Sequence, residues 1–369
     1  MAPDAAIVAT LFEVARTHFV SGNVGQSEPA IVALLAEDPD HFYGLQMLAQ
    51  LREVQGRHDD AAALWQQANR IRPGHARSWT RRAVILLRRN WGMPPSPRRR
   101  QSDRPGLSVS RLGISGRFGN QLLQYGIARL IAERHGLAFE APDWIGRDLF
   151  RFDDPLLTHP TRPPIENGEE AAMQALVAPP TIEAPPDARL NGDLSGFFQS
   201  PTGQWAARRD NFRKLFAFQG KAASAIDLAW NRLADKGDPV VAIHLRRGDF
   251  GRKGFWIAPT EWYIAWLNQI WPQLPHAVLY VASDDAAVIA DFKRFDPVVS
   301  EDIADALPGA EFLIDFAMLM RSPVLGISNS SFSFVAAMLN PNLTTSFRPM
   351  RQRRSLIPFD PWNAPVLLP

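Results

Sequence analysis

The hydrophobic pattern divides the chain into a helical first part and a mixed second part. The first ninety residues carry a helical pattern that repeats. From residue 238 onward, short apolar runs alternate with helical stretches. This predicts strands at 240–245, 277–282 and 323–327, and helices at 259–271, 286–295, 315–321 and 332–339. Strands that alternate with helices indicate a parallel, doubly wound sheet, so the expected fold class is α/β.

The stretch between these parts is less regular. Residues 91–106 have the sequence WGMPPSPRRRQSDRPG, a composition typical of a linker. A strand over 107–114 leads through the turn SGRFGN into a helix over 121–136, and proline-rich loops with helices at 169–177 and 205–216 follow. The predicted organisation is helical repeats in 1–92, a linker in 93–106, a first α/β domain in 107–237 and a second with a tail in 238–369.

A period of 34 residues runs through the first part. Residues of the same type recur at this spacing: Gly22 and Gly56, Pro39 and Pro73, and Ala15, Ala49 and Ala83. The period, the turn glycine and the closing proline are those of tetratricopeptide repeats. Small side chains let paired helices approach, and the proline ends the second helix. Residues 1–92 therefore resemble two such repeats and a closing helix, with a generic helical bundle as the alternative.

Composition and charge narrow the class of protein. The chain has 369 residues, 46% of them apolar and 21% charged, as in ordinary globular proteins. It has no cysteine, which excludes disulfides, thiolate metal sites and cysteine nucleophiles and fits a reducing compartment. We expect no membrane span and no signal peptide, because no apolar run is long enough and the N-terminal stretch lacks a basic start.

The net charge of +2 conceals a basic block. Between residues 70 and 104 there are eleven arginines and a single acid, Asp103. Such a block could contact anionic lipid headgroups or nucleic acid, and the alternative is a solvated helix face followed by a linker. We do not expect a nucleic-acid partner, because that would need aromatic side chains interleaved with the basic ones.

Polar side chains gather where the predicted strands of the second α/β domain end. The strand 240–245 runs into HLRRGD, in which alternation places His244 and Arg246 on one face and Arg247 on the other. Arginine is the preferred ligand of a diphosphate, and Asp249 could orient an arginine or accept a proton. Pairing of these arginines with nearby acids is the alternative. Ligands of doubly wound sheets bind at the carboxyl ends of strands, so a binding site is expected here.

Three further segments carry candidate chemistry. VLYVASDD places Ser283 and Asp284 after a strand, where an aspartate could hold a ribose or guanine, a metal, or only cap a helix. SNSSF follows another strand and opens a helix, whose free amides could bind an anion. Capping alone would also explain its serines. In SGRFGN the glycines would let Arg117 and Asn120 reach a substrate. The chain has neither a dinucleotide-binding GxGxxG sequence nor a Walker A sequence.

Four segments in this order resemble the alpha-1,2-fucosyltransferase family, glycosyltransferase family 11. They are GRFGNQLLQYGIAR, LSGFFQS, HLRRGDF and DFAMLMRSPVLGISNSSFSFVAAMLN, and the resemblance covers residues 107 to about 350. This chain has Phe250 where the family has tyrosine, and Phe334 and Val335 where it has paired tryptophans. These departures bear on the acceptor more than on the donor nucleotide.

The resemblance implies a GT-B-like fold of two facing α/β domains, with 107–237 on the acceptor side and 238–369 binding the nucleotide sugar. It implies inverting transfer of fucose from GDP-fucose to the 2-hydroxyl of a galactoside, without a metal or other cofactor. The expected catalytic residues are Arg246 and Asn120, which the resemblance places at the diphosphate and facing the cleft, and Asp249, the candidate base because an acceptor hydroxyl gains from one. For donor binding the resemblance implies Gly119, His244, Asp284, Ser330, Ser331 and Phe332, and the strand ends and the glycine turn add Arg117, Arg247, Ser283 and Asn329.

Three other functions stay open from the sequence. They are a metal-dependent glycosyltransferase that uses Asp284 and Asp285, a glycosyltransferase that uses another nucleotide sugar, and a tetratricopeptide adaptor with an inactive transferase domain. The helical repeats suggest a protein partner or a polypeptide acceptor. We expect a cytoplasmic protein, with the arginine block resting on the inner membrane face.

Overall fold

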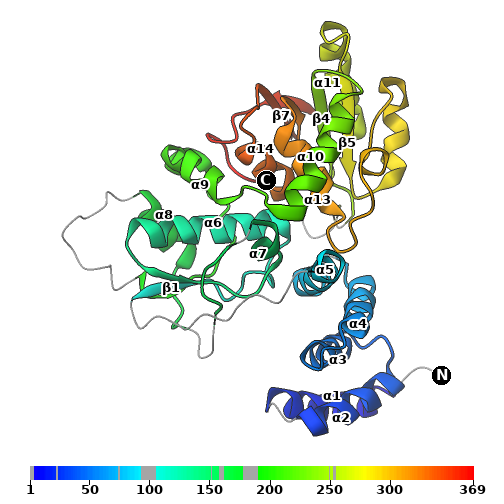
Figure 1. Ribbon diagram of the computed structural model, residues 1–369, viewed down its shortest axis with the longest axis vertical. Coiled ribbons are helices and arrows are strands. Elements are labelled where there is room, and N and C mark those ends of the chain that lie inside the picture. Colours follow the sequence, from blue (N-terminus) through cyan, green and yellow to red (C-terminus); the bar gives the residue numbers. More distant parts are fainter. Residues whose placement is uncertain are drawn as a thin grey trace. The chain divides into compact units, whose positions relative to one another are not determined.

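The structure is a computed structural model that describes residues 4–21, 24–73, 75–92, 105–150, 152–157, 162–177, 190–248, 250–251 and 255–369. The chain divides into two compact units, Met1–Met93 and Pro94–Pro369 (Figure 1). The candidate base Asp249 lies outside the described residues.

The first unit is all-helical, as the pattern predicts. Its helices are α1 (Ala5–Val20), α2 (Val24–Glu37), α3 (Phe42–Val54), α4 (His58–Ile71) and α5 (Ala76–Trp91). The alanines that recur with the 34-residue period are buried, and Trp65 packs with Ala49 and Ala61 in the core between α3, α4 and α5. Small side chains at these positions let the helices approach. The assignment to tetratricopeptide repeats stays a prediction.

The first half of the second unit contains a small parallel sheet. Its strand order is β2 (Ala138–Glu140), β1 (Gly106–Ser108), β3 (Gly192–Asp193). The long helix α6 (Phe118–Arg134) is buried over most of its surface, because apolar side chains surround it and the ring of Phe212 reaches the Cα of Gly126. The other helices of this half are α7 (Ile145–Phe150), α8 (Gly168–Val177), the 3-10 helix η2 (Thr202–Arg208), α9 (Arg209–Leu215) and α10 (Gly220–Ala234).

The second half contains a five-stranded sheet. The order is β5 (Val278–Ser283), β4 (Val240–Leu245), β6 (Val324–Gly326), β7 (Thr345–Met350), β8 (Ser355–Pro358), and only β8 is antiparallel to its neighbour. The helices are α11 (Thr260–Ile270), η3 (Trp271–Gln273), η4 (Ala286–Phe295), α12 (Ser300–Ile303), α13 (Phe312–Arg321) and α14 (Ser331–Leu339). Two successive α/β halves and an all-α N-terminal segment confirm the expected GT-B-like fold class.

Some elements differ from the predicted ones. The first strand ends at Ser108 instead of continuing to 114, because the backbone N–H and the hydroxyl of Ser110 turn onto the carboxylate of Asp193. The helix predicted at 205–216 is divided between the 3-10 helix η2 and α9, and within η2 Trp205 has non-helical backbone angles. The stretch 286–295 is a 3-10 helix. Helix α10 and strands β7 and β8 were not predicted.

The end of the chain connects the two halves of the second unit. Thr202 exchanges hydrogen bonds with Ala364, and its hydroxyl also donates to the carbonyl of Pro361 at 2.8 Å. Trp362 packs its ring against Trp205 at a centroid distance of 5.2 Å and donates its indole N–H to the carbonyl of Met338. The segment after β8 is therefore part of the packing of the first half.

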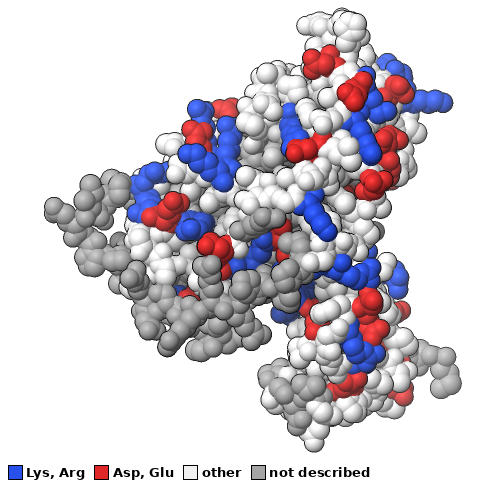
Figure 2. Space-filling view, viewed as in Figure 1, with Lys and Arg blue, Asp and Glu red and all other residues white. Residues whose placement is uncertain are grey.

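The charges of the first unit are largely matched within it. Figure 2 shows acidic side chains interspersed among the basic ones. Two arginines of the basic block on α5 pair with acids of neighbouring helices, Arg81 with Glu53 and Arg89 with Asp59. Among the described residues, no helix combines the length and the apolar composition that a bilayer span requires.

Candidate functional site

The carboxyl ends of three parallel strands bring the polar segments together. In β4, Ile243 pairs with Gly326 of β6, while Leu245 pairs with Ser283 of β5. The chain therefore leaves the sheet at one edge three times, through the segments that begin at Arg246, Asp284 and Ile327. This is the edge where ligands of such sheets bind.

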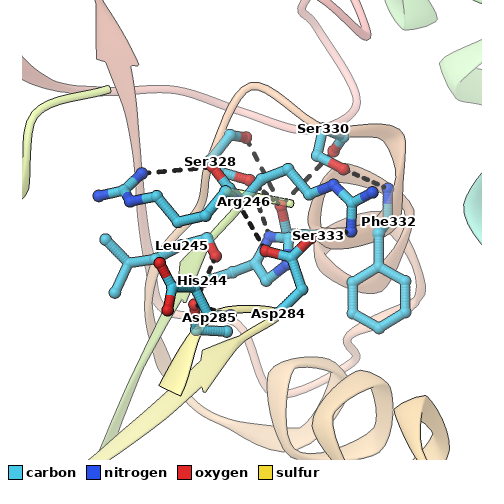
Figure 3. A network of polar contacts seen from close by, with 11 residues as sticks. His244, Leu245, Arg246, Asp284, Asp285, Ser328, Ser330, Phe332 and Ser333 are labelled. Atoms are coloured by element: carbon cyan, nitrogen blue, oxygen red, sulfur yellow. Dashed lines mark hydrogen bonds and ion pairs between the residues drawn. The ribbon is translucent and has the colours of Figure 1, made fainter. Parts of the chain in front are cut away.

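Arg246 is held at this edge by a carboxylate. Its Nη1 lies 2.5 Å from Oδ2 of Asp284, and the other carboxylate oxygen accepts the backbone N–H of Arg247 at 2.7 Å (Figure 3). A Cβ on Gly248 would lie 2.6 Å from Oδ2 of Asp284, so the glycine leaves room for this carboxylate. The Arg246 side chain is 12% exposed and that of Asp284 is 27% exposed. The pair is shielded enough to hold one geometry and open enough to meet a ligand.

The ring of Phe250 supports the same arginine. The guanidinium carbon of Arg246 lies 5.6 Å from the centroid of the Phe250 ring, which in turn stacks on Phe255. A cation over an aromatic face is attracted by the ring electrons. Phenylalanine can make this contact as tyrosine can, so Phe250 keeps it although the sequence pattern that the chain resembles has tyrosine there.

His244 is buried inside the site and is neutral. Its Nδ1 lies 2.8 Å from the hydroxyl of Ser328, and its ring packs against that of Phe332 at 5.2 Å. Burial lowers the pKa of His244 to about 4, because desolvation disfavours the imidazolium; Asp284 opposes this and Arg247 adds to it. A neutral imidazole can accept or donate a hydrogen bond here without adding a charge.

This pKa makes a testable contribution to stability. The unfolded chain takes up the histidine proton near pH 6.5, while the folded chain takes it up only near pH 4. The contribution is therefore complete above pH 6.5 and is lost as the pH falls from there toward 4. When the pH is lowered from 7 to 5, the free energy of unfolding of the wild type should fall by about 2 kcal/mol more than that of His244→Asn, as measured by urea unfolding. Equal losses in the two proteins would contradict the buried neutral state.

The start of α14 forms the second wall of the site. Ser330 is its N-cap and accepts the backbone N–H of Phe332, while Ser331 is the first helical residue. Across the unit, the start of α6 touches this point: a Cβ on Gly119 would lie 2.5 Å from the carbonyl oxygen of Ser331. Only glycine permits this approach, which places the next residue, Asn120, beside the site. Asn120 accepts a hydrogen bond from Gln199 at 2.8 Å.

Asn329 faces the chain end rather than an open cleft. Its amide donates to the carbonyl of Leu368 at 2.8 Å and accepts the backbone N–H of the same residue at 2.8 Å. Beside it, the buried guanidinium of Arg348 donates to Asn329 and to the carbonyl of Pro365. Burial lowers the pKa of Arg348 to about 10. Both side chains therefore hold the tail against the segment that starts α14.

The other predicted site residues have structural partners. Ser283 donates to the carbonyl of Leu245, and Arg247 extends to the hydroxyl of Thr260 at 2.9 Å. Asp285 caps η4 by accepting the N–H of Ala287. Arg117 is the N-cap residue of α6. With Asp284 engaged by Arg246 and Asp285 by a helix, the acid pair is arranged for orientation and capping rather than for a shared ion.

Sequence reasoning did not single out Asp315 as a site residue. It accepts a hydrogen bond from the Tyr280 hydroxyl at 2.6 Å. Burial raises its pKa to about 7, and the nearby carboxylates Glu301 and Asp284 act in the same direction. The signal was its place in the DFAMLM segment, but only the fold brings α13 beside β5 and Asp284. Among the described residues, no three His, Asp or Glu side chains are grouped so that they could hold a metal.

Comparison with solved structures gives similarities at low sequence identity. Fucosyltransferase NodZ from Bradyrhizobium has a TM-score of 0.45 and 14% identity, over 70% of this chain and 99% of that one. Arabidopsis thaliana FUT1 in complex with GDP gives 0.46 and 12%, over 74% and 77%. POFUT1 in complex with GDP-fucose gives 0.41 and 14%, over 67% and 98%. No protein-family model matches the chain. The search of curated proteins gives no match.

Proposed function

We propose that the second unit is an inverting fucosyltransferase that moves fucose from GDP-fucose to the 2-hydroxyl of a galactoside without a metal ion. The observation that carries the proposal is the Arg246–Asp284 pair at the end of β4, beside the start of α14. A permanent cation and a helix N-terminus meet at one strand edge, which suits the two charged groups of a diphosphate. The four family-like segments of the sequence supply the identity of the sugar and the acceptor.

The same residues would serve the chemistry. In an inverting transfer the acceptor oxygen forms a bond to the anomeric carbon while the bond from that carbon to the phosphate oxygen breaks. The pair of electrons leaves with GDP, and Arg246 would stabilise the charge that gathers there. The proton of the acceptor hydroxyl passes to a base, for which Asp249 is our candidate. Asn120, beside the start of α14, would orient a substrate hydroxyl.

The test is isothermal titration of the full-length protein with GDP, GDP-fucose and GDP-mannose in the presence of a chelator. We expect binding of all guanosine ligands, with GDP-fucose preferred over GDP-mannose. A preference for GDP-mannose would indicate that mannose, and not fucose, is the transferred sugar. No binding in chelator followed by binding with manganese would contradict the metal-independent mechanism. No binding under either condition would support an adaptor with an inactive transferase unit.

We also propose a protein partner or polypeptide acceptor for the helical first unit and a cytoplasmic position on an anionic membrane surface. The arginine block supports the membrane proposal, although Arg81 and Arg89 already pair with acids. Sedimentation with vesicles of phosphatidylcholine and phosphatidylserine at low salt tests it. Protein that stays in the supernatant would contradict the membrane proposal.

A further inference from the structure

Two neighbouring phenylalanines after β3 have opposite environments. They belong to the segment 194–200, LSGFFQS, at the carboxyl end of the small sheet. Phe198 is 1% exposed and packs in the core, whereas Phe197 is 44% exposed. A single exposed apolar side chain is ordinary on a protein surface. The backbone that carries Phe197, however, is held by an unusual set of contacts.

One carboxylate oxygen fixes the backbone of both phenylalanines. Oε1 of Glu169, in the first turn of α8, accepts the backbone N–H of Phe197 and that of Phe198, the latter at 3.1 Å. Gly196 makes the approach possible, because a Cβ there would collide with the Glu169 side chain. Gly168, next to Glu169, also lies close to this segment: a Cβ there would lie 2.8 Å from the carbonyl oxygen of Ser195.

Phe198 has a strained backbone. Its φ angle is 54°, in the left-handed region that a residue with a bulky side chain rarely adopts. Such a conformation costs free energy, and it persists only where surrounding contacts enforce it. Here the burial of Phe198 and the bonds to Glu169 enforce it. The result is a fixed backbone position for Phe197, whose ring is exposed.

The segment also connects to the candidate site. Gln199, two residues after Phe197, donates its amide to Asn120 at 2.8 Å. Asn120 follows Gly119, whose Cα touches the backbone of Ser331 at the start of α14. The exposed ring is therefore carried by the first α/β half, on the segment that is hydrogen-bonded to the residues beside the proposed donor site.

We propose that Phe197 is an acceptor-specificity residue whose ring stacks on the apolar face of the acceptor sugar. This inference deepens the proposed function and rests on it. A galactoside presents a face of C–H groups around C3, C4 and C5, and an aromatic ring with no polar edge complements that face. Because Glu169 already holds the backbone of Phe197, binding through the ring costs no further ordering of that backbone.

The experiment compares Phe197→Ala, Phe197→Leu and Phe197→Trp with the wild type and with Val177→Ala. Val177 ends the same helix α8 and is 48% exposed, so it is a matched surface control. The readouts are the acceptor KM with lactose, the GDP affinity by titration, and saturation-transfer NMR of methyl β-galactoside without any donor. We expect Phe197→Ala to raise the acceptor KM about tenfold and to lose the NMR signal, with GDP affinity unchanged. Tryptophan should preserve binding, and leucine should fall between.

The outcomes separate this inference from the proposed function. An unchanged acceptor KM in Phe197→Ala, in a protein that binds GDP, overturns the inference and leaves the proposed function standing. A parallel loss of GDP affinity also overturns it, because Phe197 would then only support the fold. A Phe197-dependent NMR signal in a wild type that binds no GDP supports the sugar contact and contradicts the transferase. A wild type that binds neither galactoside overturns the inference.

Discussion

Replacing Arg246 with alanine is expected to weaken GDP binding about 100-fold and to lower kcat/KM for transfer about 1,000-fold. The guanidinium is oriented by Asp284 at 2.5 Å and supported by the ring of Phe250, so its position is fixed before a ligand arrives. A charged hydrogen bond contributes more than a neutral one, and the contribution grows when negative charge gathers on the leaving diphosphate. We therefore expect a larger effect on kcat/KM than on GDP affinity, because Arg246 interacts more strongly with the transition state than with bound GDP.

The adjacent arginine provides the matched control. Arg247 donates to Thr260 and to the backbone carbonyl of Arg246, so its guanidinium points toward the start of α11. Arg247→Lys should change GDP affinity by less than about threefold, whereas Arg246→Lys should lose most of it, since lysine lacks the planar fork. Titration of both variants with GDP decides the matter. If Arg246→Ala bound GDP as tightly as the wild type, the proposal that the diphosphate binds at this strand end would be wrong.

Gly119→Ala should destabilise the second unit by about 3 kcal/mol and reduce GDP affinity as well. The new Cβ would lie 2.5 Å from the carbonyl oxygen of Ser331 and 2.6 Å from the backbone nitrogen of Phe332. Backbone atoms cannot rotate away as a flexible side chain can, so the starts of α6 and α14 must separate. Urea unfolding measures the stability, and titration with GDP measures whether the separation of α14 from α6 weakens GDP binding.

A glycine of the first unit serves as the control for this substitution. Gly25, in α2, has no atom within 4 Å of a Cβ position, and alanine favours a helix by up to about 1 kcal/mol. Gly25→Ala should therefore leave GDP affinity unchanged and should not lower stability. If Gly119→Ala were as stable as the wild type, the close helix contact would be wrong.

The periodicity of the sequence predicts much of this fold because it follows local patterns. The ends of β4, β5 and β6 lie where the apolar runs stop, and alternation of strands with helices gives the parallel sheet. β7 and β8 have no such signal, because the segment 345–358 contains two prolines and four arginines. Its strands form through the pairing of β7 with β6 and of β8 with β7. Tertiary pairing overrides weak local propensity at such positions.

The chemistry of the candidate site was less accessible from the sequence. The sequence predicts that Arg246 and Asp284 lie at the ends of two strands of one sheet. Only the structure shows that the aspartate forms an ion pair with the arginine. Asn329 illustrates the opposite case. Its motif suggests a ligand, while the structure directs its amide to Leu368, nearly forty residues later in the chain. A contact of that sequence separation has no local pattern from which it could be inferred.

The position of Trp362 and Ala364 has a consequence for how the chain assembles during synthesis. During translation the first α/β half leaves the ribosome long before residues 361–364 are made. Thr202 and Trp205 nevertheless have their partners in that later segment. Contacts between residues about 160 positions apart close slowly, because the intervening chain must first be ordered. Until those residues are made, the apolar surfaces of Trp205 and Phe212 that pack against Trp362 stay exposed. Ribosome-bound chains that stop before Pro361 are natural clients for a chaperone.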